Sequence, residues 1–362
     1  MALTKVSRGL LSGQSTKNII KNGCMRIAQR GTSFTSSGSG QYTLDRWVSG
    51  VHTGTGDGDM TQETDAPTAI QSGTAFTHSL KFQVTTANTN IQATDRKYHV
   101  YRIEGQDLAP AGFGQAGQRY MTLSFWHKHT KTGTHSLAIN NAARNRSYPM
   151  EYTQAITNTW EKAELTFPVD TTGTWLGGNG VGCWIFFGAA FGSNYAGTVN
   201  QWGSAQKYGT ANQVNNYDST SNSMQFTGVQ LELGEVATPF EHRSYGEELA
   251  LCQRYYQKFF DESSITEQVQ LIGIASGVGH FSWWPPVQMR ARPTVGITDT
   301  TPYWESLPWH AVGTSLTVSS ISNGHMGRSG GEIAVYGAYN PSLVRGTNYT
   351  MEAAVLYWDA EL

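Results

Sequence analysis

Short alternating segments dominate this chain and limit what it can fold into. Segments of about five to ten residues alternate apolar with polar side chains, or are rich in β-branched and aromatic residues, and clusters of Gly, Asn and Ser separate them. Strands with one polar and one apolar face need a second sheet to cover the apolar side. The sequence therefore predicts an all-β jelly-roll sandwich, with strands near residues 25–29, 42–49, 76–85, 97–103, 120–129, 136–140, 161–169, 183–189 and 224–233.

One segment, residues 246–260 with the sequence GEELALCQRYYQKFF, follows a helical period instead. Its apolar residues Leu249, Cys252, Tyr256 and Phe259 recur at spacings of three and four. Acidic residues open the segment and basic residues come late, which is the order that the helix dipole favours. We predict a single amphipathic helix over residues 246–261 that links two domains.

A second series of short strands follows, near residues 269–274, 279–284, 294–298, 315–321, 332–339 and 349–357. Roughly 100 residues are enough for a small sandwich. The expected organisation is an N-terminal arm at 1–21, a jelly-roll domain at 22–245, the linker helix at 246–261 and a smaller C-terminal β-sandwich at 262–362. The arm has no strand partner of its own, so we expect it to be disordered or to pair with another chain.

Charge and cysteine usage exclude several partners. Only 14% of the 362 residues are charged and the net charge is −2, so no broad basic face is expected to hold nucleic acid or anionic lipid. No run of about 18 apolar residues and no signal-peptide pattern occurs, which predicts no membrane insertion and no secretion signal. Three cysteines, an odd number at wide spacing, argue against a paired disulfide framework and fit synthesis in a reducing cytoplasm.

Two glycine-containing motifs match catalytic or cofactor patterns in letters only. Residues 112–117 have the spacing of a dinucleotide fingerprint, but an expected strand follows where a helix has to stand. Residues 327–331 match a nucleophile elbow around Ser329, and again a strand pattern follows. We therefore predict no cofactor and no catalytic residue, although two carboxylates that meet only in space would escape a sequence pattern.

Two clusters are candidate metal ligands. His127 and His129 alternate on one expected strand, and His135 follows the next turn, so three imidazoles on one hairpin face could hold a transition metal. Asp57 and Asp59 could supply carboxylate oxygens to Ca²⁺. Ordinary strand residues account for both clusters more readily, since neither has a complete ligand set.

Aromatic residues in polar, glycine-rich loops give the strongest functional signal. Flat aromatic faces suit sugar rings, whose axial C–H groups rest on the π face while neighbouring amides bond the hydroxyls. The same residue types also fill thin sandwich cores and subunit interfaces. The candidate contact surfaces are the loops at 176–217 and 304–310, and the candidate glycan-binding residues are Trp175, Tyr195, Trp202, Tyr217, Trp304 and Trp309.

Three blocks of residues resemble bacteriophage tail-fibre, or receptor-binding, proteins. The first is NGCMRIAQRGTSF at 22–34 followed by YTLDRW at 42–47, which is similar to an opening strand pair. The second is FTGVQLELG at 226–234, then ATPFE at 237–241 and ELALCQRYY at 248–256, which is similar to a closing strand and the following helix. The third is PVQMRARPTV at 286–295 together with the ending DAEL.

This resemblance implies a carbohydrate-binding-module-like jelly roll, a C-terminal sandwich and a homotrimer that attaches to a host surface glycan or lipopolysaccharide. It also implies a place in the virion tail, contact with other tail or baseplate proteins, and synthesis in the host bacterial cytoplasm. We therefore expect a non-catalytic adhesin. A glycan depolymerase or esterase of a tailspike, and a structural tail adaptor, remain the alternatives.

Overall fold

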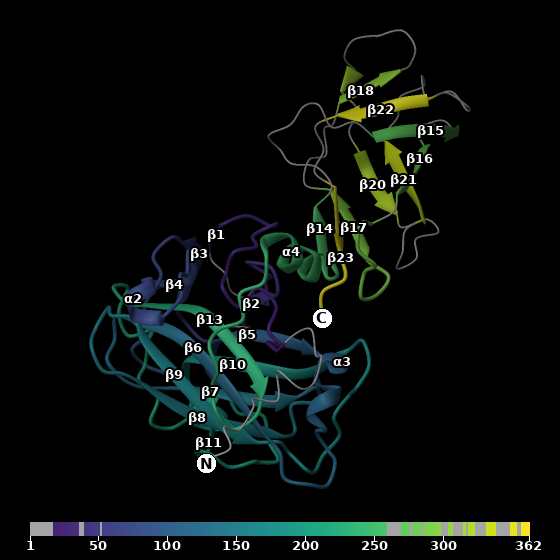
Figure 1. Ribbon diagram of the computed structural model, residues 1–362. Helices are drawn as coiled ribbons and strands as arrows, with labels where there is room; N and C mark the ends of the chain where they lie inside the picture. The colour runs from purple at the N-terminus through teal and green to yellow at the C-terminus, as the bar shows by residue number, and fades with distance from the viewer. Residues whose placement is uncertain are drawn as a thin grey trace. The chain divides into compact units, whose positions relative to one another are not determined.

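In the computed structural model the chain divides into two compact units, Met1–Glu248 and Leu249–Leu362 (Figure 1). The structure describes residues 17–35, 40–50, 53–258, 269–275, 278–283, 285–297, 303–306, 314–315, 318–322, 331–337, 348–352 and 356–362. No helix in these ranges is long and apolar enough to cross a membrane.

The first unit is built from two antiparallel sheets. A six-stranded sheet has the order β1-β3-β4-β13-β6-β9, with strands β1 Ser33–Phe34, β3 Asp57–Glu63, β4 Ser79–Thr86, β13 Ser223–Leu233, β6 Tyr120–His129 and β9 Glu161–Pro168. A five-stranded sheet has the order β2-β5-β10-β7-β8, with strands β2 Trp47–Ser49, β5 Arg96–Glu104, β10 Val181–Phe191, β7 Gly133–Asn141 and β8 Ser147–Gln154.

The chain crosses repeatedly from one of these sheets to the other, for example from β4 to β5 and from β5 to β6. This exchange of strands between two facing antiparallel sheets is a jelly roll. The predicted fold class, all-β with an N-terminal jelly-roll sandwich, is therefore confirmed.

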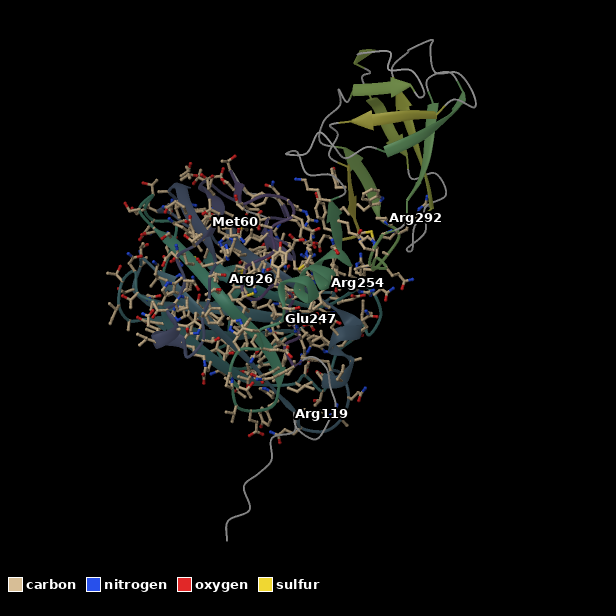
Figure 2. All side chains as sticks on the ribbon, turned by 45° about the horizontal axis from the view of Figure 1, so that its top comes forward. Arg26, Met60, Arg119, Glu247, Arg254 and Arg292 are labelled. Atoms are coloured by element: carbon tan, nitrogen blue, oxygen red, sulfur yellow. The ribbon has the colours of Figure 1, made fainter. Side chains whose placement is uncertain are left out.

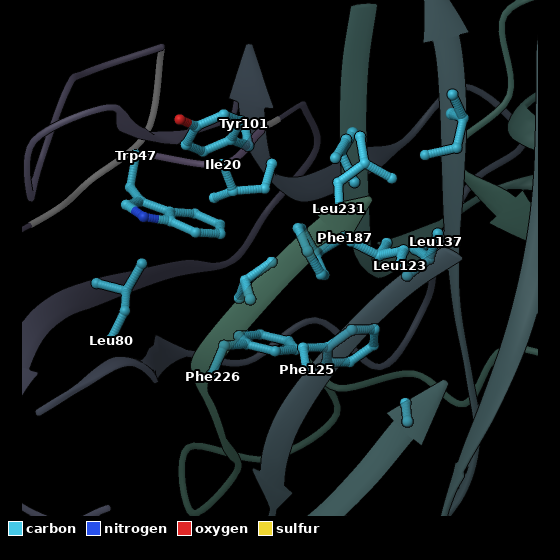
Figure 3. Packing of buried hydrophobic residues seen from close by; sticks show 14 of the residues in the cluster. Ile20, Trp47, Leu80, Tyr101, Leu123, Phe125, Leu137, Phe187, Phe226 and Leu231 are labelled. Atoms are coloured by element: carbon cyan, nitrogen blue, oxygen red, sulfur yellow. The ribbon is translucent and has the colours of Figure 1, made fainter. Parts of the chain in front are cut away.

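A continuous apolar core lies between the two sheets. Strand alternation sends one set of side chains from each sheet inward, and the buried cluster includes Trp47, Tyr101, Phe125 and Phe187. Figure 3 shows Trp47 beside Tyr101, whose ring centroids are 5.0 Å apart. Such aromatic contacts add to the burial of apolar area as the main source of the unit's stability.

Short helices and a small parallel pair complete the first unit. They are α2 Ala69–Ser72, α3 Gly105–Leu108, the 3₁₀ turns η1 Ala109–Ala111 and η2 Ser193–Tyr195, and the pair β11 Ala196–Gly197 with β12 Gly209–Thr210. Residues 17–21, the end of the predicted arm, belong to this unit: Ile19 N donates to the Leu231 carbonyl of β13, and Ile20 is fully buried.

The second unit contains two further antiparallel sheets. One has the order β14-β23-β17 and the other β19-β18-β22-β15-β16-β21-β20. Their bounds are β14 Tyr256–Lys258, β15 Val269–Ala275, β16 Val278–Trp283, β17 Thr294–Ile297, β18 Tyr303–Ser306, β19 Thr314–Ser315, β20 Val318–Ser322, β21 Gly331–Gly337, β22 Asn348–Glu352 and β23 Leu356–Asp359.

The predicted helix over 246–261 is wrong at residues 256–258, and residues 259–261 lie outside the described residues. Helix α4 spans Tyr245–Gln253, and residues 256–258 form β14, which pairs with β23. Tyr255 and Tyr256 are buried. A segment of only three residues fits a helix or a strand by its local pattern, and its pairing with a strand from the end of the chain decides between them.

The predicted strand at 25–29 is also wrong, because local side-chain bonds replace a strand partner. Asn22 and Met25 both have positive φ, 55° and 59°, a conformation that breaks a strand. The Asn22 side chain accepts a hydrogen bond from Ile27 N and donates one to Ile27 O. The backbone of Ile27 is thus satisfied without a neighbouring strand.

Candidate functional site

The outer face of the five-stranded sheet carries a second cluster of aromatic residues, separate from the core. Along β10, Cys183, Ile185 and Phe187 point inward, so the alternating residues Trp184 and Phe186 point outward. Neighbouring outer-face residues on β2 and β5, and residues of the loop after β10, complete the cluster. It comprises buried Val48, Tyr98, Val100, Phe186 and Tyr208, with the half-buried residues Tyr42, Trp184, Phe191 and Tyr195 packed against it. We call this surface the aromatic face.

A loop lies across the middle of the aromatic face. Tyr208 stacks on Tyr98 with ring centroids 4.4 Å apart, and Tyr195 packs on Tyr208 at 4.8 Å. Lys207 O accepts a hydrogen bond from Asn140 Nδ2, which fastens the loop to β7. The loop buries the centre of the face and leaves half-exposed rings on either side.

On one side of that loop, arginine side chains alternate with rings. Arg102 lies opposite Trp184 in the β5–β10 register, and its guanidinium carbon lies 4.6 Å from the Trp184 ring centroid and 5.3 Å from that of Tyr42. Arg30 lies 5.1 Å from the Tyr42 ring, and Arg144 lies 5.4 Å from the Trp184 ring. Each contact is within the range of a cation–π interaction.

On the other side, Phe191 borders an open hollow of about 280 Å³. Its lining mixes apolar and polar groups: Ile91, Phe191, Gly192, Ser193, Ala196, Thr210, Ala211 and Gln213. Gln213 is fixed by the amide and hydroxyl of Ser136, both 2.6 Å from Gln213 Oε1. A few oriented polar groups beside an aromatic ring are what a sugar site needs.

Trp175 and Trp202, two of the predicted binding residues, meet in a different cluster with Phe113. The Trp175 ring lies 4.2 Å from Phe113 and 5.7 Å from Trp202, and both indoles are half-buried. Each indole N–H is already used, by Thr172 O and Pro168 O respectively. These rings hold loops together and keep only part of their faces open.

Tyr195 lies on the aromatic face, whereas the prediction for Tyr217 as a surface contact residue is contradicted. Tyr217 is fully buried and packs on Phe82 at 5.4 Å. Burial raises the pKa of its phenol well above the ordinary value. The loop turns inward there because Asn88 N donates to Tyr217 O and the Asn215 side chain bonds Tyr217 N.

The remaining two predicted residues stay predictions. Trp304 falls on β18, whose backbone alone is described, and Trp309 lies outside the described residues. Ser329 lies outside them as well. The glycine-rich stretch 112–117 follows η1 and precedes strand β6, as predicted. Arg119, labelled in Figure 2, lies just after this stretch and donates from Nη1 to Ala111 O just before it.

The three histidines come together, but inside the core. His129 stacks between His127 and His135 at ring distances of 5.2 and 4.2 Å. Their ring nitrogens bond Gln154 Oε1, Tyr152 Oη and Lys131 O, which are neutral partners. Burial lowers the pKa of His127 and of His135 to about 4 and that of His129 well below its usual value. Within the described ranges, no group of His, Cys, Asp and Glu has the arrangement of a metal site.

The positive charge near Asp57 comes from the side chain of Lys97. Lys97 is fully buried, and its Nζ lies 3.0 Å from Gly56 O and 4.7 Å from the Tyr217 ring centroid. Asp57 and Asp95 lie close enough to raise its pKa, although burial outweighs them and the pKa is lowered. Asp57 and Asp59 alternate along β3 on its half-exposed side.

Tyr42, Arg102 and Trp184 were not predicted from the sequence as binding residues. One signal was present: β10 carries apolar residues on both faces, with Cys183, Ile185 and Phe187 alternating with Trp184 and Phe186. A strand in a two-layer sandwich needs only one apolar face, so the second marks a covered or ligand-binding surface.

Comparison with known proteins gives distant likenesses. No protein-family model and no curated protein matches the sequence. Among solved structures, the carbohydrate-binding module TmCBM61, in complex with β-1,4-galactotriose, is 10% identical, covers 61% of this chain and 100% of its own, and has a TM-score of 0.28. The family 11 carbohydrate-binding module from Clostridium thermocellum, in complex with a β-1,3-1,4-mixed-linked tetrasaccharide, has the same identity and TM-score and covers 58% and 98%.

A candidate sugar-binding protein from Bacteroides thetaiotaomicron is 12% identical, covers 60% of this chain and 100% of its own, and has a TM-score of 0.33. Likeness at this level assigns no ligand, so function is inferred below from the residues of this chain.

Proposed function

We propose that the first unit binds polysaccharide on the aromatic face and catalyses no reaction there. The observation that carries this proposal is the set of half-exposed rings, Tyr42, Trp184, Phe191 and Tyr195, on the outer side of a rigid sheet. Rings fixed by strands and by stacking present their edges and faces without further loss of side-chain entropy. A polysaccharide can follow such a row, with C–H groups on the rings and hydroxyls on nearby polar groups.

Polar groups for the hydroxyls stand beside these rings. Asn140, opposite Trp184 in the β7–β10 register, uses its Nδ2 on the covering loop, while its buried Oδ1 has no hydrogen-bond partner among the described residues. Glu151 on β8 bonds Asn212 Nδ2 and the Thr210 hydroxyl at the hollow. The Asn140 side chain is fully buried, so the half-buried Glu151 and the exposed Asn212 are the polar groups that a bound sugar can reach.

For the whole chain we propose a bacteriophage tail fibre that adheres, as a homotrimer, to a host surface glycan or lipopolysaccharide. The support is the resemblance of residues 22–47, 226–256 and 286–295 to such proteins, together with the aromatic face. The proposal places the chain in the virion tail, next to other tail or baseplate proteins, after synthesis in the host bacterial cytoplasm. A single sugar site is shallow and binds weakly. Linked copies bind more tightly, because each bound site raises the effective concentration of the ligand at the others.

A pull-down on immobilised envelope polysaccharide, with reducing sugars measured in the same samples, tests the proposal. The expected result is retention without sugar release, and a loss of retention in Trp184→Ala. Trp175→Ala is the matched control, because it removes an equally large half-buried indole from the other aromatic cluster. Sugar release would favour a depolymerase, and no retention across a broad host panel would favour a structural adaptor.

A further inference from the structure

Guanidinium groups lie beside the half-exposed rings of the aromatic face. Tyr42 has Arg30 and Arg102 against it, and Trp184 has Arg102 and Arg144 against it. Phe186 also stacks on Trp184, nearly parallel at 4° and 5.7 Å. This side of the aromatic face therefore offers N–H donors next to the ring surface that a sugar would contact.

Arg144 is the most informative residue of this group. It occupies the turn between β7 and β8 with a positive φ of 56°, a conformation that costs an arginine about 1 kcal/mol and that Gly or Asn adopts more readily. The turn itself is fixed by Asn141, whose Oδ1 accepts from the amides of Asn145 and Arg146. The turn therefore does not require an arginine at 144.

The position of Arg144 also leaves its charge available. The residue is exposed, its guanidinium takes part in none of the ion pairs found in the described part of the chain, and its guanidinium carbon lies 5.4 Å from the Trp184 ring centroid. This contact holds the guanidinium beside the indole and leaves N–H donors exposed to solvent. A planar fork of donors held in this way matches the two oxygens of a carboxylate.

The charge of this region contrasts with that of the molecule. The chain carries a net charge of −2, whereas Arg30, Arg102 and Arg144 lie together around two rings. Arg144 is the exposed member of this group, and an exposed positive charge on a nearly neutral protein attracts an anionic ligand and orients its approach.

We propose that the aromatic face selects acidic polysaccharides, with Arg144 receiving a carboxylate of a uronic-acid unit beside Trp184. This inference rests on the proposed function, because it names the class of glycan that the same face binds.

Binding of the full chain to polygalacturonate and to its fully methyl-esterified form tests the charge requirement. The two polymers share a backbone and differ in free carboxylates. We expect the esterified polymer to bind about tenfold more weakly, because one charge-assisted contact is lost. The preference for the free acid should shrink as salt is added.

Arg144→Asn is the informative variant, since Asn tolerates the positive φ and removes only the charge and the stacking. We expect it to weaken binding to polygalacturonate severalfold and to leave binding to the esterified polymer unchanged. Lys162→Gln is the matched control: it removes one positive charge from the exposed side of β9, in the other sheet, and is expected to change neither.

The outcomes separate the two proposals. Equal binding of the free and the esterified polymer, with no effect of Arg144→Asn, would overturn the selection of acidic glycans. Equal binding of neutral dextran, or binding of neutral glycans alone, would also overturn it. Each of these results would leave the proposed glycan binding intact. Retention of neither acidic nor neutral glycans would overturn the proposed function together with this inference.

Discussion

Lys97 shows how one residue can serve where a metal would otherwise be expected. Its ammonium donates to the carbonyl of Gly56 and lies over the ring of Tyr217, and the carboxylates of Asp57 and Asp95 are near enough to raise its pKa. Carbonyl and carboxylate oxygens gathered at one point need a cation. The lysine supplies it from inside the fold.

We predict that Lys97→Met lowers the free energy of unfolding by about 1 to 2 kcal/mol, because it leaves the carbonyl of Gly56 without its side-chain donor. Lys162→Met, at an exposed position, is the control and should change it by no more than about 0.5 kcal/mol. Urea unfolding followed by tryptophan fluorescence measures both. Equal stability of the two variants would mean that Lys97 has no such role.

The stack of His127, His129 and His135 predicts a loss of stability in mild acid. Folding keeps these imidazoles neutral by lowering their pKa, while in the unfolded chain they titrate near 6.5. The unfolded state therefore takes up protons first as the pH falls below 6.5. We expect His127 and His135 each to cost about 2 kcal/mol of stability by pH 5, and His129 to add to this loss.

Urea unfolding at pH 7.5 and at pH 5 measures this effect. Carboxylates with lowered pKa, such as Asp65 and Asp170, contribute mainly below that window. His78→Gln, at a half-buried histidine outside the stack, should leave most of the pH dependence in place. A free energy of unfolding that is the same at both pH values would contradict the buried, neutral stack.

At the scale of elements, a β-bulge in β13 explains the glycine in FTGVQLELG, a block that resembles tail-fibre proteins. The register between β13 and β6 shifts between Thr227 and Gln230, and Gly228 within it has a φ of +61°. A Cβ at Gly228 would lie 2.7 Å from Phe76 Cζ. The glycine in FTGVQLELG is thus needed for backbone conformation and for space.

Gly228→Ala is expected to destabilise the first unit by about 2 to 3 kcal/mol, because strain at positive φ and a steric clash act together. Gly73→Ala separates the two causes. Gly73 has a φ of +73° with nothing near its missing Cβ, so its substitution should cost about 1 kcal/mol. Thermal unfolding of both variants gives the comparison, and similar losses would contradict the steric part.

Most strands could be predicted from alternation, and the exceptions have identifiable reasons. Strand β3, DGDMTQE, carries few apolar residues, and β8, SYPMEYTQ, contains Pro149; both patterns argue against a strand in isolation. Their places in the sheets come from pairing with β4 and β7. Long-range pairing of this kind leaves no local sequence signal.

The candidate site was predictable only in part, for a similar reason. Aromatic residues in loops pointed to Tyr195, but they also pointed to Tyr217, which the fold buries. The aromatic face is assembled from residues as distant in sequence as Val48 on β2, Tyr98 on β5 and Trp184 on β10. Only the order of strands in the five-stranded sheet brings them together.

At the scale of the whole molecule, the proposed trimer predicts strong avidity. Light scattering should give a mass three times the chain's 39.6 kDa. Affinity for the long polysaccharide should exceed that for a short fragment of the same glycan by about a hundredfold or more, because linked sites raise the effective concentration. A monomeric mass with equal affinity for polymer and fragment would contradict this arrangement.

Hydroxyl-radical footprinting of the full chain, with and without the polysaccharide that it retains, tests the central claim most directly. The account predicts that bound glycan protects Tyr42 and Trp184 from oxidation and leaves Trp175 and Trp202 as reactive as before. Protection confined to Trp175 and Trp202, with Trp184 unchanged, would contradict it and move the binding site to the other aromatic cluster.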